Sequence, residues 1–133
     1  VYQAGTLSGN PVAMAAGIAQ LTILKETPNF YKDLNEKSDC FFTEMDSILH
    51  NAHIPHCLNH IGSLGCVFFT REKVKDYDSA QTSRTRKFRI FFRHMLDKHI
   101  YIAPSQFEAM FISSAHTQED LELTLEAVRE FDL

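Results

Sequence analysis

The sequence predicts an α+β fold in which helices cover a small, mostly antiparallel sheet. Stretches with apolar residues three and four positions apart alternate with short β-prone runs, and glycines separate two of those runs as in a hairpin. The 133 residues are 44% hydrophobic and 23% charged, which favours one folded unit with a single core and excludes a disordered chain.

The first predicted element is a helix over residues 11–26. Asn10 can cap its N-terminus, and the proline that follows occupies the first helical position, where its missing N–H costs nothing. Every side of this helix is apolar or small, so we expect it to be covered on all faces. Thr27 and Pro28 repeat the capping signal and predict a second, amphipathic helix that ends at about Asn51.

The next predicted elements are two strands, residues 54–61 and 66–70, which Gly62 and Gly65 separate. Residues 71–83 are polar and show no periodicity, which predicts a loop.

The last part of the chain is predicted to return from helix to sheet and back. The apolar face of residues 84–98 predicts a helix. Residues 100–103 and 110–114 have the composition of strands on either side of a turn at Pro104. Thr117 opens a capping box, which predicts a last helix with a buried stripe.

Charge and cysteine content exclude several classes of protein. The net charge is −4, so we expect neither a nucleic-acid nor a membrane-surface partner. The apolar stretch before residue 25 is shorter than the roughly 20 residues that span a bilayer. Three cysteines without a CxxC pair favour the cytoplasm. We interpret the basic residues between 71 and 98 as a solvated face. We expect no metal site, because the candidate ligands lack a standard zinc spacing; they are His53, His56, Cys57 and His60.

The loop that precedes the first helix is a candidate anion site. It includes Gly5, Thr6, Ser8 and Gly9, which combine close backbone approach with two hydroxyl donors at a helix N-terminus. It matches neither the P-loop nor the dinucleotide-binding fingerprint. The residues therefore leave open a phosphate cradle or simply a well-capped helix start.

Glu108 is the second candidate. It is the only Asp or Glu between residues 98 and 118, and it follows the turn between two apolar segments. Carboxylates in such surroundings occur at working sites, but a solvated loop carboxylate explains the pattern equally well.

Two segments also carry a resemblance to a known family. Residues 1–17 read VYQAGTLSGNPVAMAAG, and residues 100–109 read IYIAPSQFEA, followed by Ala-His-Thr at 115–117. In order and separation they closely resemble glutamate-1-semialdehyde 2,1-aminomutase. Related class III aminotransferases share the Gly-Asn-Pro helix start, but not usually the Ala-Pro-Ser-Gln-Phe-Glu segment.

The resemblance implies the C-terminal part of a fold-type I enzyme that depends on pyridoxal 5'-phosphate and pyridoxamine 5'-phosphate. Residues 1–26 would be the end of the large domain and a linking helix, and residues 27–133 the C-terminal small domain. The implied enzyme is a cytoplasmic homodimer, an isomerase that converts glutamate-1-semialdehyde to 5-aminolevulinate in tetrapyrrole (porphyrin) biosynthesis. The family's cofactor-binding lysine is expected upstream of Val1, so residues 1–133 alone are expected to be inactive.

Only three residue roles follow from the resemblance. Gly5 and Thr6 match the family's Gly-Thr pair, which contacts the cofactor phosphate across the dimer interface. Glu108 matches the family's active-site glutamate near the substrate. His99 and Met110 stand where the family usually has glycine. Another class III aminotransferase and a free-standing, non-enzymatic binding module are the alternatives.

Overall fold

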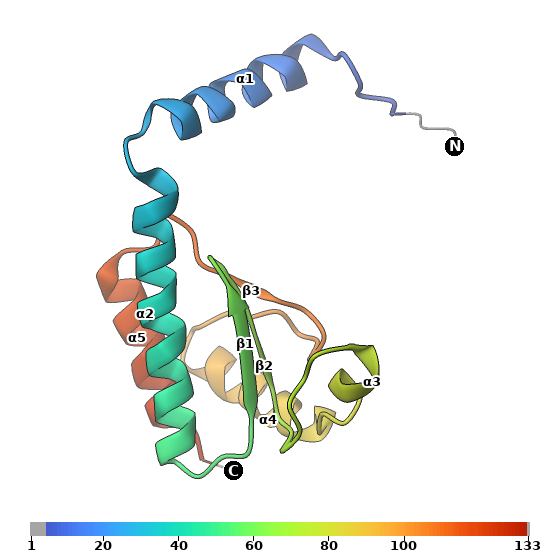
Figure 1. Cartoon of the computed structure of the whole chain (residues 1–133), viewed down its shortest axis with the longest axis vertical. Coiled ribbons are helices and arrows are strands. Elements are labelled where there is room, and N and C mark those ends of the chain that lie inside the picture. The colour runs from blue at the N-terminus through green and yellow to red at the C-terminus, as the bar shows by residue number, and fades with distance from the viewer. Residues whose placement is uncertain (1–4, 133) are drawn as a thin grey trace. The chain divides into compact units, whose positions relative to one another are not determined.

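The computed structural model describes residues 5–132, and the chain divides into two compact units, Val1–Asp33 and Leu34–Leu133. Figure 1 shows the order of helices and strands in the described residues. The helices are α1 (Pro11–Glu26), α2 (Phe30–Asn51), α3 (Tyr77–Ala80), α4 (Thr85–Asp97) and α5 (Gln118–Arg129), and the strands are β1 (Cys57–Ile61), β2 (Leu64–Phe68) and β3 (Met110–Phe111).

Helix α1 begins and ends where the sequence predicts. The Asn10 side-chain oxygen accepts hydrogen bonds from the N–H groups of Val12 and Ala13, at 3.0 and 3.1 Å. No residue of α1 is buried, so the expectation that the helix is covered on all faces is not met. The described part of the first unit, residues 5–33, contains a turn, α1 and the start of α2, and these residues offer too few apolar side chains to cover a helix of 16 residues.

The predicted start of the second helix is wrong. Thr27 ends α1 instead of capping α2, because its N–H and its hydroxyl both donate to the carbonyl of Ile23, at 3.0 and 2.7 Å. Asn29 then takes a left-handed backbone conformation with φ 58°, and α2 begins at Phe30. A threonine whose hydroxyl bonds back to the preceding turn cannot also cap the helix that follows.

The three strands form an antiparallel sheet in the order β1-β2-β3, which confirms the predicted hairpin and the predicted α+β fold. Strand β3 pairs only two residues with β2. The strand predicted over residues 100–103 is absent. Ile100 and Ile102 pack against the core from a segment without regular secondary structure, so their β-prone composition reflects burial and not sheet pairing.

The predicted loop 71–83 contains a short helix, α3. The Asp76 carboxylate accepts a hydrogen bond from the Ser79 N–H at 2.8 Å, and the Ser79 hydroxyl oxygen accepts one from the Asp76 N–H at 3.1 Å. This capping box builds one helical turn from polar residues, which is why hydrophobic periodicity gave no signal.

The core of the second unit lies between the sheet and three helices. Helices α2 and α5 run side by side (Figure 1), and an ion pair joins Glu44 to Arg129. Phe42 from α2, Phe69 just after β2 and Phe91 from α4 are fully buried. Helices α4 and α5 match the predicted segments, including the capping box at Thr117. None of the helices within residues 5–132 is both long enough and apolar enough to cross a membrane.

Candidate functional site

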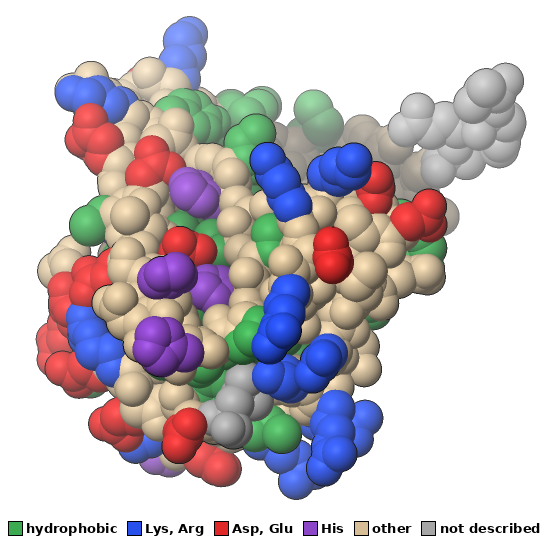
Figure 2. Space-filling model, turned by 60° about the horizontal axis from the view of Figure 1, so that its bottom comes forward, with side chains coloured by type: hydrophobic (Ala, Val, Ile, Leu, Met, Phe, Trp, Pro, Cys, Tyr) green, Lys and Arg blue, Asp and Glu red, His purple; other side chains and the backbone are tan. Residues whose placement is uncertain are grey.

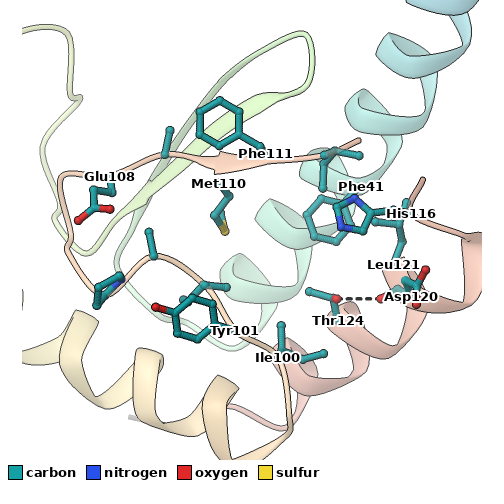
Figure 3. A pocket seen from close by; sticks show the side chains of 15 residues that line it. Phe41, Ile100, Tyr101, Glu108, Met110, Phe111, His116, Asp120, Leu121 and Thr124 are labelled. Atoms are coloured by element: carbon teal, nitrogen blue, oxygen red, sulfur yellow. Dashed lines mark hydrogen bonds between the residues drawn. The ribbon is translucent and has the colours of Figure 1, made fainter. Parts of the chain in front are cut away.

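The second unit contains a pocket of about 460 Å³. Its walls come from residues 100–104, from residues 108–112, from Phe41 of α2 and from the first turns of α5. The turn between residues 104 and 108 brings the first two walls together (Figure 3). The sequence predicted that turn, but it gave no signal that α5 faces the same space.

Glu108 lies at one end of this pocket (Figure 3). Its N–H donates to the carbonyl of Ser105 at 3.2 Å, which closes the turn. The side chain is exposed and forms no hydrogen bond or ion pair with any residue between 5 and 132. A carboxylate of this kind can bind a cationic or hydrogen-bonding group that enters the pocket.

The polar groups at the opposite end are already engaged. The Asp120 carboxylate accepts from the N–H and the hydroxyl of Thr117, both at 2.7 Å, and these bonds lower the pKa of Asp120. Thr124 donates its hydroxyl to the Asp120 carbonyl at 2.8 Å, and His116 Nδ1 accepts from the Ser113 N–H at 2.9 Å. These side chains stabilise the start of α5, so they are less available to a ligand.

Between the two ends the pocket is mainly apolar. Met110 points into it from β3, and the Tyr101 ring lies opposite (Figure 3). The thioether of Met110 thus forms part of the wall beside Glu108, where the resemblance leads one to expect a glycine. Met110 and Glu108 both line the pocket, so a ligand that reaches the carboxylate would also contact this side chain.

Gly5 and Thr6 lie in the turn that precedes α1. The Gly5 carbonyl accepts from the Ser8 N–H at 3.1 Å, and Gly9 has φ 76°. The Thr6 hydroxyl is exposed and bonds to no residue among 5–132. Asn10 occupies the first free N–H groups of α1, so an anion at this turn would depend on the turn itself. Residues 1–4 of the predicted loop lie outside the described residues.

The turn is compact and lies in an uncharged stretch of the sequence. A Cβ atom added to Gly5 would lie 2.5 Å from the Ser8 hydroxyl, so the turn is compact at this position. No charged residue occurs before Lys25, so no carboxylate close in sequence would repel an anion. The turn belongs to the first unit and Glu108 to the second.

Two other surfaces of the second unit carry basic or histidine side chains. Arg86, Arg89 and Arg93 of α4 are exposed, as expected of a solvated face. Figure 2 shows histidine side chains beside acidic ones. His56 contacts Asp46 at 3.1 Å, and His60 of β1 contacts Asp39 of α2 at 3.0 Å. Within residues 5–132 no three potential metal ligands come together.

Solved structures define the class of protein to which this fold corresponds. A β-phenylalanine aminotransferase from Variovorax paradoxus is 26% identical with a TM-score of 0.84, over 97% of this chain and 29% of that protein. A glutamate-1-semialdehyde-aminomutase from Pseudomonas aeruginosa, solved in complex with PMP, has a TM-score of 0.80 at 20% identity, over 96% and 28% of the two chains. The fold is therefore that of a C-terminal domain of fold-type I aminotransferases.

Curated relatives narrow this class. Glutamate-1-semialdehyde 2,1-aminomutase 1 of Lachnoclostridium phytofermentans is 52% identical over 131 residues, which are 98% of this chain and 31% of the relative. The aminomutase of Ruminiclostridium cellulolyticum is 53% identical over 130 residues, 98% and 30% of the two chains. No protein-family model matches. The chain spans about 30% of the length of these relatives and is similar to their C-terminal part, which confirms the resemblance.

Proposed function

We propose that this chain forms the C-terminal part of a glutamate-1-semialdehyde 2,1-aminomutase, an isomerase that moves an amino group within its substrate to give 5-aminolevulinate for tetrapyrrole biosynthesis. One observation carries the proposal. The uncommitted carboxylate of the pocket, Glu108, stands in the segment that resembles the aminomutases, within a chain 52% identical to one of them over 98% of its length.

The proposed cofactor is pyridoxal 5'-phosphate, alternating with pyridoxamine 5'-phosphate. Its chemistry is that of an electron sink and a carrier of the amino group. Gly5 and Thr6 would hold its phosphate, since the Thr6 hydroxyl is exposed and uncommitted and Gly5 permits close approach of the backbone. We assign this contact to the cofactor of a second subunit, and hence propose a homodimer. The three cysteines without a CxxC pair favour the cytoplasm as its compartment. No lysine of this chain is assigned to the cofactor.

The proposed domain organisation follows the same assignment. Residues 1–26 form the end of a large domain and a linking helix, and residues 27–133 form the small domain. In this arrangement Glu108 faces the substrate, and Gly5 and Thr6 face the phosphate. The negative charge of Glu108 attracts and orients the amino group of the substrate, and Tyr101 and Met110 supply an apolar surface beside it.

Replacement of Glu108 tests the substrate role. In the enzyme that contains this chain, Glu108→Gln keeps the size of the side chain and removes its charge, so kcat/KM should fall about tenfold or more, equivalent to at least about 1.4 kcal/mol. The absorption spectrum of the bound cofactor should persist. Glu119→Gln on α5 is the control, because Glu119 is exposed outside the pocket. Normal turnover of the Glu108 variant would remove this residue from the site.

Replacement of Thr6 tests the phosphate role. Thr6→Val should weaken cofactor affinity by about 1–3 kcal/mol, the range for a hydrogen bond to a charged group, and should leave the Tm of the apoenzyme nearly unchanged. Thr27→Val is the matched control, because the Thr27 hydroxyl bonds to the backbone at the end of α1. It should affect stability and not cofactor affinity. An early-melting Thr6 variant with unchanged affinity would contradict the proposal.

The fold likeness to an aminotransferase supports a second candidate, a class III aminotransferase with two substrates. An aminomutase yields 5-aminolevulinate from glutamate-1-semialdehyde alone, whereas an aminotransferase needs both an amino donor and an acceptor. Measurement of product with and without a second substrate separates the two. A non-enzymatic binding module would give no product in either assay.

A further inference from the structure

The turn that carries Glu108 is attached to β2 by side chains and not by strand pairing. The ladder between β2 and β3 contains only the pairs Leu64–Phe111 and Gly65–Met110. If the ladder continued, the next residues of β2 would pair with residues 109 and 108. The chain leaves the ladder at that point, so other contacts must hold residues 104–109.

Gln106 supplies the first of these contacts. Its side chain is among the most buried polar groups of the chain, at 3% exposure. Its Nε2 donates to the carbonyl of Val67 at 2.5 Å, and its Oε1 accepts from the N–H of Phe69 at 3.4 Å. These two backbone groups flank Phe68, and a neighbouring strand would bond to them through a peptide group. The Gln106 amide therefore takes the place of a strand residue.

Cys66 supplies the second contact. Its Sγ lies 3.5 Å from the carbonyl oxygen of Gln106 and 3.6 Å from that of Glu108. Burial, together with the neighbouring Cys57, raises the pKa of Cys66 to about 11. The thiol is therefore protonated at neutral pH and can donate to either carbonyl, whereas a thiolate would repel both.

We propose that Gln106 and Cys66 are positioning residues that fix the backbone of the turn and thereby hold the Glu108 carboxylate at its place in the pocket. The proposal rests on the function proposed above. The Glu108 side chain has no partner among residues 5–132, so only its backbone can set its position. Gln106 anchors the turn two residues earlier, and Cys66 contacts the carbonyl of Glu108 itself.

A double-mutant cycle in the enzyme that contains this chain tests the proposal. Gln106→Met keeps an unbranched side chain of similar length and removes both hydrogen bonds. We expect it to lower kcat/KM about tenfold when Glu108 is present, and less than about twofold in the Glu108→Gln background. A loss of the same factor in both backgrounds would overturn the proposal, because a merely structural role does not depend on the charge of Glu108.

Asn59 offers a matched control. It also joins the hairpin to a distant loop through a side-chain amide, which donates to the carbonyl of Val74 at 2.9 Å. It lies outside the pocket of Glu108. Asn59→Leu should lower the Tm and leave kcat/KM within about twofold of the parent enzyme. An equal loss of kcat/KM in the Asn59 and Gln106 variants would also count against the proposal.

Cys66 gives a second measurement that does not depend on the folding of the Gln106 variant. Cys66→Ser keeps a hydrogen-bond donor, and Cys66→Ala removes it. We expect the serine variant to retain kcat/KM within about threefold and the alanine variant to lose clearly more, again only when Glu108 is present. Equal activity of the two variants would contradict the proposal. If Glu108→Gln alone has normal kcat/KM, the proposed role of Glu108 fails, and the positioning proposal fails with it.

Discussion

The two turns that carry the candidate site residues are held in different ways. The turn at residues 5–10 is closed by bonds between near neighbours, Ser8 to Gly5 and Asn10 to Leu7. The turn at residues 104–109 has a local bond as well, from Glu108 N–H to Ser105, but hydrogen bonds to β2 and Phe69 that span 37 to 42 residues of sequence also hold it. Local bonds form wherever their own few residues are present, whereas the position of the second turn is fixed only once β2 is in place.

The second turn should therefore be sensitive to changes far from it. Its anchor, β2, is itself positioned by α2, because the ring of Phe42 packs directly on Gly65. A substitution that displaces β2 should therefore loosen the turn at residues 104–109. The same substitution should leave the bonds within residues 5–10 unchanged, because these bonds are local.

The largest expected effect comes from Gly65→Ala. A Cβ atom there would lie 2.3 Å from the nearest atom of the fully buried Phe42 ring. Overpacking of this degree should lower the free energy of unfolding by about 3 kcal/mol, measured by urea denaturation. Gly17→Ala in α1 is the control, because nothing lies within 4 Å of its added Cβ. That variant should gain helix stability, by about 1 kcal/mol. A neutral Gly65 variant would show that β2 can shift freely.

The same difference explains which parts of the fold could be predicted from sequence. Helices α1, α4 and α5 have local start signals or an apolar stripe. The observed bounds of α1 and α4 fall within about a residue of those predicted, and α5 starts directly after its predicted cap, Thr117. The strand expected at residues 100–103 was wrong, because whether an extended segment pairs depends on a free edge elsewhere. The edge of β2 is occupied by β3 and by the Gln106 amide.

The candidate site likewise has a part that could be predicted from local sequence and a part that depends on packing. Gly5, Thr6 and Glu108 could be named because short segments around them resemble a family. The pocket beside Glu108 could not be predicted, because Phe41 and the first turns of α5 join it only through the packing of the second unit. The role of Gln106 was equally hidden, since nothing in its neighbours shows that its amide bonds to residues 67 and 69.

Two locally formed helix ends provide the next test. Helix α4 ends in a Schellman motif, in which the N–H of His99 donates to the Leu96 carbonyl and the N–H of Ile100 to the Met95 carbonyl. His99 has φ 64°. Helix α2 ends in the same way at His53, with φ 56°. Glycine suits this conformation, so His99→Gly and His53→Gly should each raise the free energy of unfolding by about 1 kcal/mol.

Urea denaturation measures this gain, with His99→Ala as the control because alanine keeps the Cβ atom that opposes a positive φ. Because the bonds at these helix ends are local, neither glycine variant should change kcat/KM in the enzyme. Loss of stability in both glycine variants would show that the histidine rings contribute more than the backbone strain costs.

A smaller gain is expected at the start of α4. Arg84 occupies the N-cap without a side-chain hydrogen bond, and the first turn contains Arg86 and Lys87 but no acid. Arg84→Asp would supply a cap and a favourable charge near the helix N-terminus, worth about 0.5–1 kcal/mol in urea denaturation. Arg89→Asp changes charge equally but lies further along the helix, and it should give no such gain. Equal effects of the two substitutions would indicate general charge repulsion and not capping.

The smallest effect concerns the pH dependence of the long-range contacts. Folding raises the pKa of Cys66 from 9.0 to about 11, so the folded state holds the thiol proton more tightly than the unfolded state. The stabilisation is complete below pH 9 and is lost as the pH rises from 9 towards 11.

Because other groups titrate in the same range, the useful quantity is the difference in unfolding free energy between the parent chain and Cys66→Ala. That difference should shrink between pH 8 and pH 10.5, and the change should be modest because the thiol is only partly buried. A difference that stays constant across this range would mean that the thiol ionises as easily in the folded chain as in the unfolded one, and that its contacts with the 104–109 turn do not depend on its proton.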